Sequence, residues 1–402
     1  MKIGTFILPL LFSFSTAVAS EATIMWAGGE HLELGEQGAL SACREMGITD
    51  NLCPSRTIHR EDKKIIFSYG EIVTSADFYD TPAEMYADRR KGVKNVIKCA
   101  HKQQHNNEEE QQTGKEKETH CDLKSFLSMP TYLEVVSKNY AHFGWHNMVA
   151  YVKYHQIALD KAAKAFALRK KSPQESYELF NQALVTNAFA DHYLTDAFAS
   201  GHIRVPRTQI KDWAEANLSG LLKKNRGNLL TMVMHDRESI GLRSQKEEGL
   251  PVMNSLGESW ITRADSHLHV LNGPQDEARI RPERAVQTSV KEILTAYLTG
   301  EVPTGIFKAT ELVPFNQDIP LIEKFSPRYQ GMTKKELVNA FFGDEHIYER
   351  IIHRRSDLSQ MLDALPQIFV TFRKEVSQAI SKNPELSRRL PARYLEAYQK
   401  VN

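Results

Sequence analysis

Residues 187–206 read NAFADHYLTDAFASGHIRVP and contain three side chains that can bind a metal ion, His192, Asp196 and His202. His192 and Asp196 are four positions apart, so a helix would place them on one face. Gly201 is the expected end of that helix, because glycine readily adopts the left-handed conformation found there. His202 would then lie just beyond the turn, near the other two. Imidazole and carboxylate groups suit zinc, although the same spacing also occurs in simple ion pairs on helix surfaces.

The composition is that of an ordinary globular protein. The chain has 402 residues, of which 41% are hydrophobic and 25% charged, and its net charge is +1. This length suits two domains, or one large domain with an appendage. The small net charge argues against a dedicated nucleic-acid-binding protein, which usually carries a basic excess.

The N-terminus has the pattern of a signal peptide, which we predict at residues 1–20. Lys2 precedes an apolar stretch that is too short to span a membrane, and a small-residue cleavage pattern ends at Ala19. No later stretch approaches the length of a transmembrane helix. We therefore expect an exported protein without a transmembrane segment, either secreted or periplasmic.

The cysteines agree with export. Cys43, Cys53, Cys99 and Cys121 all lie in the first third of the chain, and none belongs to a CxxC pair, which argues against a thiolate zinc site. In an oxidising compartment two disulfides are the simplest expectation. Four cysteines allow three pairings, and we favour the local ones, Cys43–Cys53 and Cys99–Cys121.

Hydrophobic periodicity predicts a mostly helical chain. We expect a helix that starts after Trp26 and ends near Gly47, and others over 132–167, 174–199, 210–234 and 286–297. Residues 241–260 are interrupted by Gly, Pro and Asn and should form a loop or a small hairpin. The polar run at 101–120 should be a solvated loop.

Histidines and aspartates that can bind metal are spread over several of these helices. Asp77 is embedded among apolar residues, where a carboxylate needs a partner. The candidate ligands are His31, Asp77, His142, His192, Asp196, His202 and His235. This set contains no cysteine, and such a set suits zinc sites that carry out hydrolysis better than structural zinc sites.

These residues resemble the zinc-dependent phospholipase C and single-strand nuclease superfamily. Its central motif is His, three residues, Asp, five residues and His, and His192, Asp196 and His202 have this spacing. Asp77 follows a segment like the one in which the family places an aspartate. His142 is followed by a phenylalanine, as the family's histidine on the next helix is.

The resemblance extends over roughly residues 26–265, because Trp26 and His31 look like the family's N-terminal Trp and His. It implies an all-α fold, and we place the phospholipase C-like domain at 21–285. The C-terminal hundred-odd residues fall outside the resemblance, and their amphipathic pattern predicts a mostly helical extension at 286–402. The resemblance also implies up to three zinc ions. Their ligands would be Asp77, His142, His192 and Asp196 for the first, Asp196, His31 and Trp26 for the second, and His202, His235 and an acidic residue for the third.

Three assignments leave alternatives open. The family's Trp binds metal through its own amine, so Trp26 would have to become the first residue, beyond the cleavage site expected near Ala19. The acidic ligand is assigned to Glu238, with Asp236 as the alternative, because the family's position is taken here by Ser239. Four positions after His142, a second histidine, His146, competes with it as a ligand.

The implied reaction is hydrolysis of a phosphodiester by a zinc-activated water, with Asp77 as both ligand and general base. The segments around His31, Asp77 and His235 look like secreted bacterial phospholipase C. The expected substrate is therefore a phospholipid at a membrane surface, such as phosphatidylcholine, which would give diacylglycerol and a phosphorylated headgroup. The alternatives are a single-strand zinc nuclease and an exported helical binding protein with no enzymatic activity.

Overall fold

The computed structural model describes residues 28–49, 52–54, 58–59, 66–87, 92–113, 140–203, 205–219, 227–228, 230–231, 235, 250–263, 268, 276–315 and 356–399. Helices dominate this part of the chain, so the expected all-α fold class is confirmed. The described strands form two antiparallel hairpins of two strands each. Among the described helices, none is both long and apolar enough to cross a membrane. The predicted signal peptide, at 1–20, lies outside the described residues.

The described elements, in chain order, are α2 (Gly28–Glu45), β1 (Ile58–His59), β2 (Ile66–Phe67), α3 (Tyr69–Ser75), η1 (Ala76–Phe78), α4 (Pro82–Ala87), α5 (Gly92–Thr113), η2 (Tyr140–His142), α8 (Trp145–Leu168), α9 (Pro173–Asp196), α10 (Ser200–Ile203), α11 (Arg207–Asn217), β3 (Leu250–Met253), β4 (Ser259–Thr262), α13 (Glu277–Thr299), η3 (Lys308–Glu311), α15 (Ser356–Lys382), α16 (Pro384–Arg389) and α17 (Ala392–Gln399).

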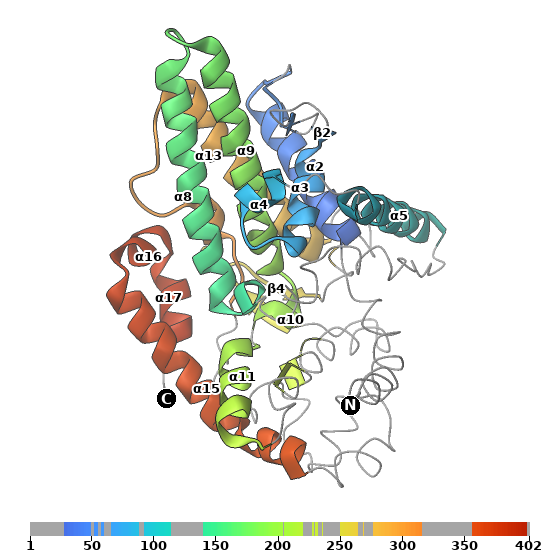
Figure 1. The fold of residues 1–402 in the computed structure, drawn as a ribbon, viewed down its shortest axis with the longest axis vertical. Helices are drawn as coiled ribbons and strands as arrows, with labels where there is room; N and C mark the ends of the chain where they lie inside the picture. The colour runs from blue at the N-terminus through green and yellow to red at the C-terminus, as the bar shows by residue number, and fades with distance from the viewer. Residues whose placement is uncertain are drawn as a thin grey trace, which may run out of the picture.

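α9 is the central helix of a bundle. It forms a long hairpin with α8, and α13 and α2 lie along the same bundle (Figure 1). Every residue of α9 from Ala183 to Asp196 is buried. A helix that is buried on all sides sits in the middle of the core rather than on its surface. The polar side chains of this stretch must therefore find their partners inside the protein.

Glycines let α2 and α3 approach closely enough to bring their functional residues to α9. A Cβ atom on Gly70 would lie 2.1 Å from the carbonyl oxygen of Leu32, and one on Gly35 would lie 2.8 Å from the Cα of Gly70. α3 begins with a capping box in which Ser68 and Glu71 bond to each other's backbone. This contact fixes where α3 starts and places Asp77 in η1, just beyond its end.

The C-terminal helices pack against the same bundle. Residues 285 and 286, where the sequence suggested a domain boundary, lie in the middle of α13, and Ala285 and Val286 are both fully buried. Arg389 of α16 donates hydrogen bonds to the carbonyl oxygens of Pro303, at 2.6 Å, and Gly305, at 2.9 Å. Helices from both sides of that position therefore contribute to one packed unit.

Two expectations about residues 101–167 were wrong. Gly144 has a φ of +54°, which interrupts the single helix expected over 132–167 and separates η2 from α8. Residues 132–139 lie outside the described part. α5 continues to Thr113 through much of the run expected to be a loop. Gln, Glu and Lys are good helix formers, and Gln103 accepts a hydrogen bond from the backbone of Gly29 at 2.9 Å, so this polar helix is anchored on α2.

One disulfide joins Cys43 to Cys53, as the local pairing predicted, with a Cα–Cα distance of 5.7 Å. Cys99 is also disulfide-bonded. Cys121 lies outside the described residues, so the Cys99–Cys121 pairing stays a prediction. Gly47, with a φ of +66°, follows the end of α2, as expected for a glycine at this position.

Candidate metal centre

The candidate ligands gather at the end of the α8–α9 hairpin that lies away from its connecting turn (Figure 1). α9 ends at Asp196, and tight turns follow it. The backbone N–H of Ala199 donates to the carbonyl of Asp196 at 3.1 Å, and that of His202 donates to the carbonyl of Ala199 at 2.9 Å. These turns lead into the short helix α10, which carries His202 back beside Asp196.

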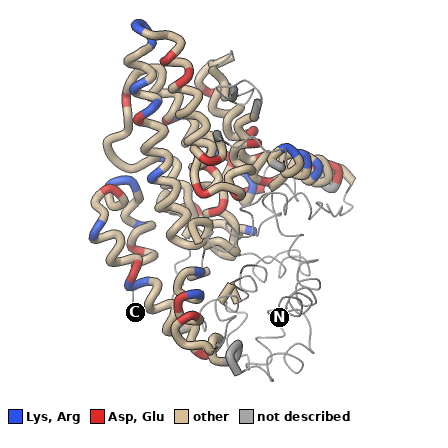
Figure 2. Tube along the Cα trace, in the orientation of Figure 1, with Lys and Arg blue, Asp and Glu red and all other residues tan. Residues whose placement is uncertain are grey.

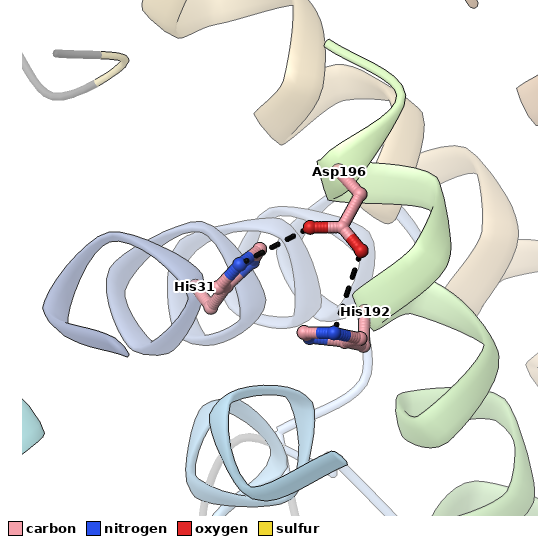
Figure 3. Close-up of side chains that lie close together, drawn as sticks. All are labelled: His31, His192 and Asp196. Atoms are coloured by element: carbon pink, nitrogen blue, oxygen red, sulfur yellow. Dashed lines mark ion pairs between the residues drawn. The ribbon is translucent and has the colours of Figure 1, made fainter. Parts of the chain in front are cut away.

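The carboxylate of Asp196 lies among four histidine rings. Its Oδ1 atom is 3.4 Å from Nε2 of His31 and 3.6 Å from Nδ1 of His202. Its Oδ2 atom is 2.8 Å from Nδ1 of His142 and 3.4 Å from Nε2 of His192. Figure 3 shows His31 reaching across from α2 to meet the two side chains of α9. Each carboxylate oxygen thus faces its own pair of imidazoles.

Asp77 adds a second carboxylate that faces the same Nε2 atom of His192 as Asp196 does. Its Oδ1 atom is 3.3 Å from Nε2 of His192 and 3.7 Å from Nδ1 of His142. The side chain of Asp77 is 20% exposed, whereas that of Asp196 is only 2% exposed. Asp77 is therefore the carboxylate of the pair that is open to solvent.

The spacing of these atoms fits a metal ion. Two ligand atoms about 2.1 Å from one tetrahedral ion lie about 3.4 Å apart. Two groups of three residues have ligand atoms within 4.8 Å of one another, and His192 belongs to both. Within them, Nε2 of His192 and Nδ1 of His142 approach to 2.9 Å. The two groups are His31, His192 and Asp196, and Asp77, His142 and His192.

The electrostatics of the cluster show how strongly its members are coupled. Burial would raise the pKa of Asp77, but His192, His142 and His31 hold that pKa well below its usual range. Burial would lower the pKa of His192, but Asp196 and Asp77 raise it to about 9. Without a metal ion, the two carboxylates therefore favour the protonated form of His192. A metal ion that takes its Nε2 atom must displace that proton.

η2 and α10 hold each other in place around the cluster. The Nδ1 atom of His202 donates to the backbone carbonyl of His142 at 2.7 Å, and the backbone N–H of Gly144 donates to the carbonyl of His202 at 2.5 Å. The ring of Phe143 stacks on that of His202 with centroids 4.8 Å apart. Two segments that carry candidate ligands, 60 positions apart, therefore have a fixed relative placement.

A further pair of imidazoles extends the cluster. The Nε2 atoms of His202 and His235 are 2.9 Å apart. Gly201 is not the helix end that the sequence suggested, because it lies within α10, where a Cβ atom would come 2.9 Å from the His235 ring. Its role is to let His235 approach. The acidic residue expected beside this pair, Glu238 or Asp236, lies outside the described residues, as does Trp26.

His146 does not join the cluster, although it is four residues after His142. Gly144 lies between them, so the two histidines do not share a helix face. The Nε2 atom of His146 is buried with no hydrogen-bond partner, and burial lowers the pKa of this histidine to about 4. The histidine that faces the carboxylates is His142.

A second buried polar cluster in α9 was missed from the sequence. Asp191 accepts hydrogen bonds from Tyr69 and Ser289, both at 2.6 Å, and from Asn187 at 3.3 Å. Asn187 accepts in turn from His155 at 2.6 Å. The signal for it was present, because Asn187, Asp191 and Thr195 recur every four residues of α9, which places them on one stripe of the helix.

Comparisons with known proteins return no match, whether against family models, curated proteins or solved structures.

Proposed function

We propose that this protein is an exported zinc-dependent phosphodiesterase of the phospholipase C type. The observation that carries the proposal is the carboxylate of Asp196 between four imidazoles, at the end of a buried helix. The supporting sequence pattern is the spacing of His192, Asp196 and His202. A buried set of His and Asp side chains is costly unless their charges are neutralised, and a bound ion would do this.

The donor set fits zinc better than the common alternatives. Imidazole nitrogens outnumber carboxylate oxygens in the cluster, whereas magnesium and calcium prefer oxygen ligands. Because the two oxygens of Asp196 face different histidines, this residue is suited to bridge two ions. The residues that would hold zinc are His31, Asp77, His142, His192, Asp196, His202 and His235, with Trp26 and Glu238 as further ligands by resemblance.

Bound zinc supplies Lewis acidity at a phosphoryl oxygen and lowers the pKa of a water molecule to about 7. Asp77 is the proposed general base, because its partly exposed carboxylate is the one that solvent can reach. Asp196, which is fully enclosed, orients the histidines instead. In this scheme no side chain serves as a covalent nucleophile, so a direct displacement at phosphorus is the proposed reaction class.

A lipid surface is supported by exposed apolar side chains near the cluster. Tyr140, two residues before His142, is 51% exposed, and Ile261 is 52% exposed. Ile261 precedes Thr262, whose hydroxyl donates to the carbonyl of Phe198 just after α9. A phospholipid such as phosphatidylcholine is therefore our proposed substrate. Buried aromatic residues nearby, such as Trp145 at 2% exposed, are core residues and do not serve as headgroup contacts.

Charge gives the nuclease alternative no particular support. Positive and negative positions are interspersed along the described helices in Figure 2, and the net charge of the chain is +1. Single-strand nucleic-acid binding usually uses a positively charged groove together with stacked aromatic rings. Nucleic acid therefore remains the second candidate substrate and is an outcome of the test below.

The test combines zinc content with hydrolysis of two substrates. Wild type, Asp196→Ala and Asp160→Ala would be assayed for bound zinc, for turnover of phosphatidylcholine vesicles and for cleavage of single-stranded DNA. Asp160 is the matched control, because it is an exposed aspartate on α8 that bonds only to the side chain of Gln156. We expect zinc and lipid turnover in wild type and Asp160→Ala, and loss of both in Asp196→Ala.

Other outcomes would change the assignment. Cleavage of DNA without lipid turnover would make the protein a nuclease. Less than one zinc ion per chain with neither substrate cleaved would refute the metalloenzyme and leave the non-enzymatic binding protein. The proposed export has its own test, since mass spectrometry of the protein recovered outside the cytoplasm would show whether the mature chain begins near Ser20 or at Trp26.

A further inference from the structure

His31 contacts a residue that is not itself a candidate metal ligand, on the side of its ring opposite Asp196. Its Nδ1 atom lies 2.8 Å from the hydroxyl oxygen of Thr195, while its Nε2 atom faces Asp196. Thr195 is 1% exposed, and its hydroxyl joins two segments 164 positions apart in the chain. Buried side chains in such positions orient metal ligands in many proteins.

The hydrogen-bonding capacity of Thr195 decides which ring nitrogen of His31 carries a hydrogen. The hydroxyl has one hydrogen, and two backbone carbonyls lie within reach of it, that of His192 at 2.8 Å and that of Asp191 at 3.0 Å. Threonine hydroxyls within a helix commonly donate to a carbonyl of the preceding turn, and both contacts have that geometry, so we infer that the hydroxyl donates to one of them. With its hydrogen engaged there, the hydroxyl accepts from His31. In this arrangement the Nδ1 atom of His31 is the donor.

The hydrogen on Nδ1 determines the state of Nε2, on the opposite side of the ring. A neutral imidazole carries one hydrogen, so a hydrogen on Nδ1 leaves Nε2 with its lone pair. Nε2 is the atom that lies 3.4 Å from Asp196, in the group of residues suited to hold a metal ion. The lone pair is thus directed to the side where an ion would sit.

His202 is oriented in a similar way, but its partner is a backbone carbonyl and not a hydroxyl. Its Nδ1 atom donates to the carbonyl of His142, and its Nε2 atom faces His235. A carbonyl oxygen can only accept a hydrogen bond from the ring. A hydroxyl can donate to the ring or accept from it, and it accepts when its own hydrogen is bonded to another group. In α9 the helix carbonyls before Thr195 meet that condition. The position of Thr195 in the last turn of α9 is therefore what makes its hydroxyl an acceptor.

We propose that Thr195 is a positioning residue that holds His31 in the Nδ1–H tautomer and so presents Nε2 to the metal ion. The second half of this proposal rests on the proposed function, because it requires a bound metal. The first half concerns the metal-free protein alone. An experiment can therefore separate the two.

The test compares Thr195→Val with Thr195→Ser. Valine has nearly the shape of threonine but no hydroxyl, whereas serine keeps the hydroxyl. Long-range ¹H–¹⁵N correlation spectra of the metal-free proteins report which nitrogen of each histidine ring carries hydrogen, and the signals that vanish in His31→Gln identify His31. Zinc affinity would be measured by competition with a chelating dye. Circular dichroism would confirm folding, and Thr195→Ala would replace the valine variant if that variant were unfolded.

We expect wild type and Thr195→Ser to show the Nδ1–H form of His31 and the same zinc affinity. Thr195→Val should show a mixture of tautomers and lose about 10- to 100-fold in affinity for the ion that His31 binds. An unchanged tautomer in Thr195→Val would overturn the proposal. A changed tautomer with unchanged zinc affinity would refute the role in metal binding. If wild type bound no zinc, the proposed function would fail, and the spectra would still decide whether Thr195 sets the ring.

Discussion

Asp191 and Asp196 lie in the same helix, and both side chains are buried, yet their surroundings differ in kind. Asp191 is met by hydroxyl and amide groups, namely those of Tyr69, Ser289 and Asn187, which all donate to it. Asp196 is met by ring nitrogens of four histidines. The first carboxylate is satisfied by the protein alone. The second lies among groups that can also bind metal.

The difference separates a structural cluster from a candidate functional one. Around Asp191 each hydrogen has an acceptor, so the cluster is complete as it stands. Burial raises the pKa of Asp191 to about 7, although Ser289 and Tyr69 oppose that rise by donating to its carboxylate. Around Asp196, pairs of ring nitrogens approach each other at 2.9 Å, an arrangement that an ion between lone pairs would stabilise. Burial alone does not distinguish the two sites, whereas the chemistry of the neighbours does.

The largest expected effect is the loss of metal-dependent stability on changing Asp196 to Asn. Zinc that binds only the folded protein raises its stability by about 2.7 kcal/mol when present at 100 times its dissociation constant. Wild type should therefore melt at a higher temperature in zinc than in a chelator. Asp196→Asn should melt at the same temperature in both. A zinc-dependent shift retained in this variant would contradict the assignment of Asp196 as the central ligand.

Removing a donor from the Asp191 cluster should destabilise the fold without affecting metal binding. Ser289→Ala leaves a buried carboxylate oxygen without its donor, at a cost of about 1–3 kcal/mol in the free energy of unfolding. Denaturant titration would measure this cost. Thr288→Ala is the control, because the neighbouring hydroxyl is exposed and bonds only within its own helix. Loss of zinc from Ser289→Ala would show that the two clusters are not independent.

His146 should make stability depend on pH only in acid, because burial alone lowers its pKa. Its pKa is about 4 in the folded protein, below the ordinary value of 6.5. The unfolded chain therefore binds more protons between these values, so the contribution of His146 is complete above pH 6.5 and is lost as the pH falls toward 4. The effect of His146→Gln on the free energy of unfolding should be more favourable at pH 5 than at pH 7.5, by about 1–2 kcal/mol. Zinc binding should persist in His146→Gln and fail in His142→Gln.

The smallest effect is expected for a histidine–carboxylate pair at the surface. His101 lies 2.8 Å from Glu71, but its side chain is 51% exposed. Exposed ion pairs contribute between zero and about 1 kcal/mol, since water screens them. His101→Ala should change the free energy of unfolding by less than about 0.5 kcal/mol. A larger change would mean that α5 depends on this contact to stay packed on α3.

Sequence reasoning was most successful where spacing along one helix carries the information. The positions of His192 and Asp196 follow from helical periodicity, and the local pairing of Cys43 with Cys53 follows from proximity in the chain. It failed where a glycine has two possible roles. Gly201 was taken as a helix end, but it provides space for His235, and that contact depends on a residue 34 positions later. No local pattern contains such information.

The Asp191 cluster shows a different limit. Its polar stripe in α9 is visible in the sequence, but its partners come from α3, α8 and α13, and only the packed bundle brings them together. The loop expected at 101–120 was wrong over 101–113, the described part of it, for a related reason. A polar composition indicates exposure to water, and an exposed segment can still be a helix when its residues favour that conformation.

The packing of α2 against α13 has a consequence for how the chain is made. Ser41 in α2 bonds to Glu283 in α13, a residue 242 positions further along the chain. During synthesis the helix that carries His31 is among the first segments produced, but its partner is completed only after most of the chain. Contacts so far apart in sequence slow folding, since a long loop must close before they form. Until α13 has been synthesised, the surface of α2 that it will cover is exposed and can bind wrong partners. The risk of aggregation is therefore greatest while the chain is incomplete.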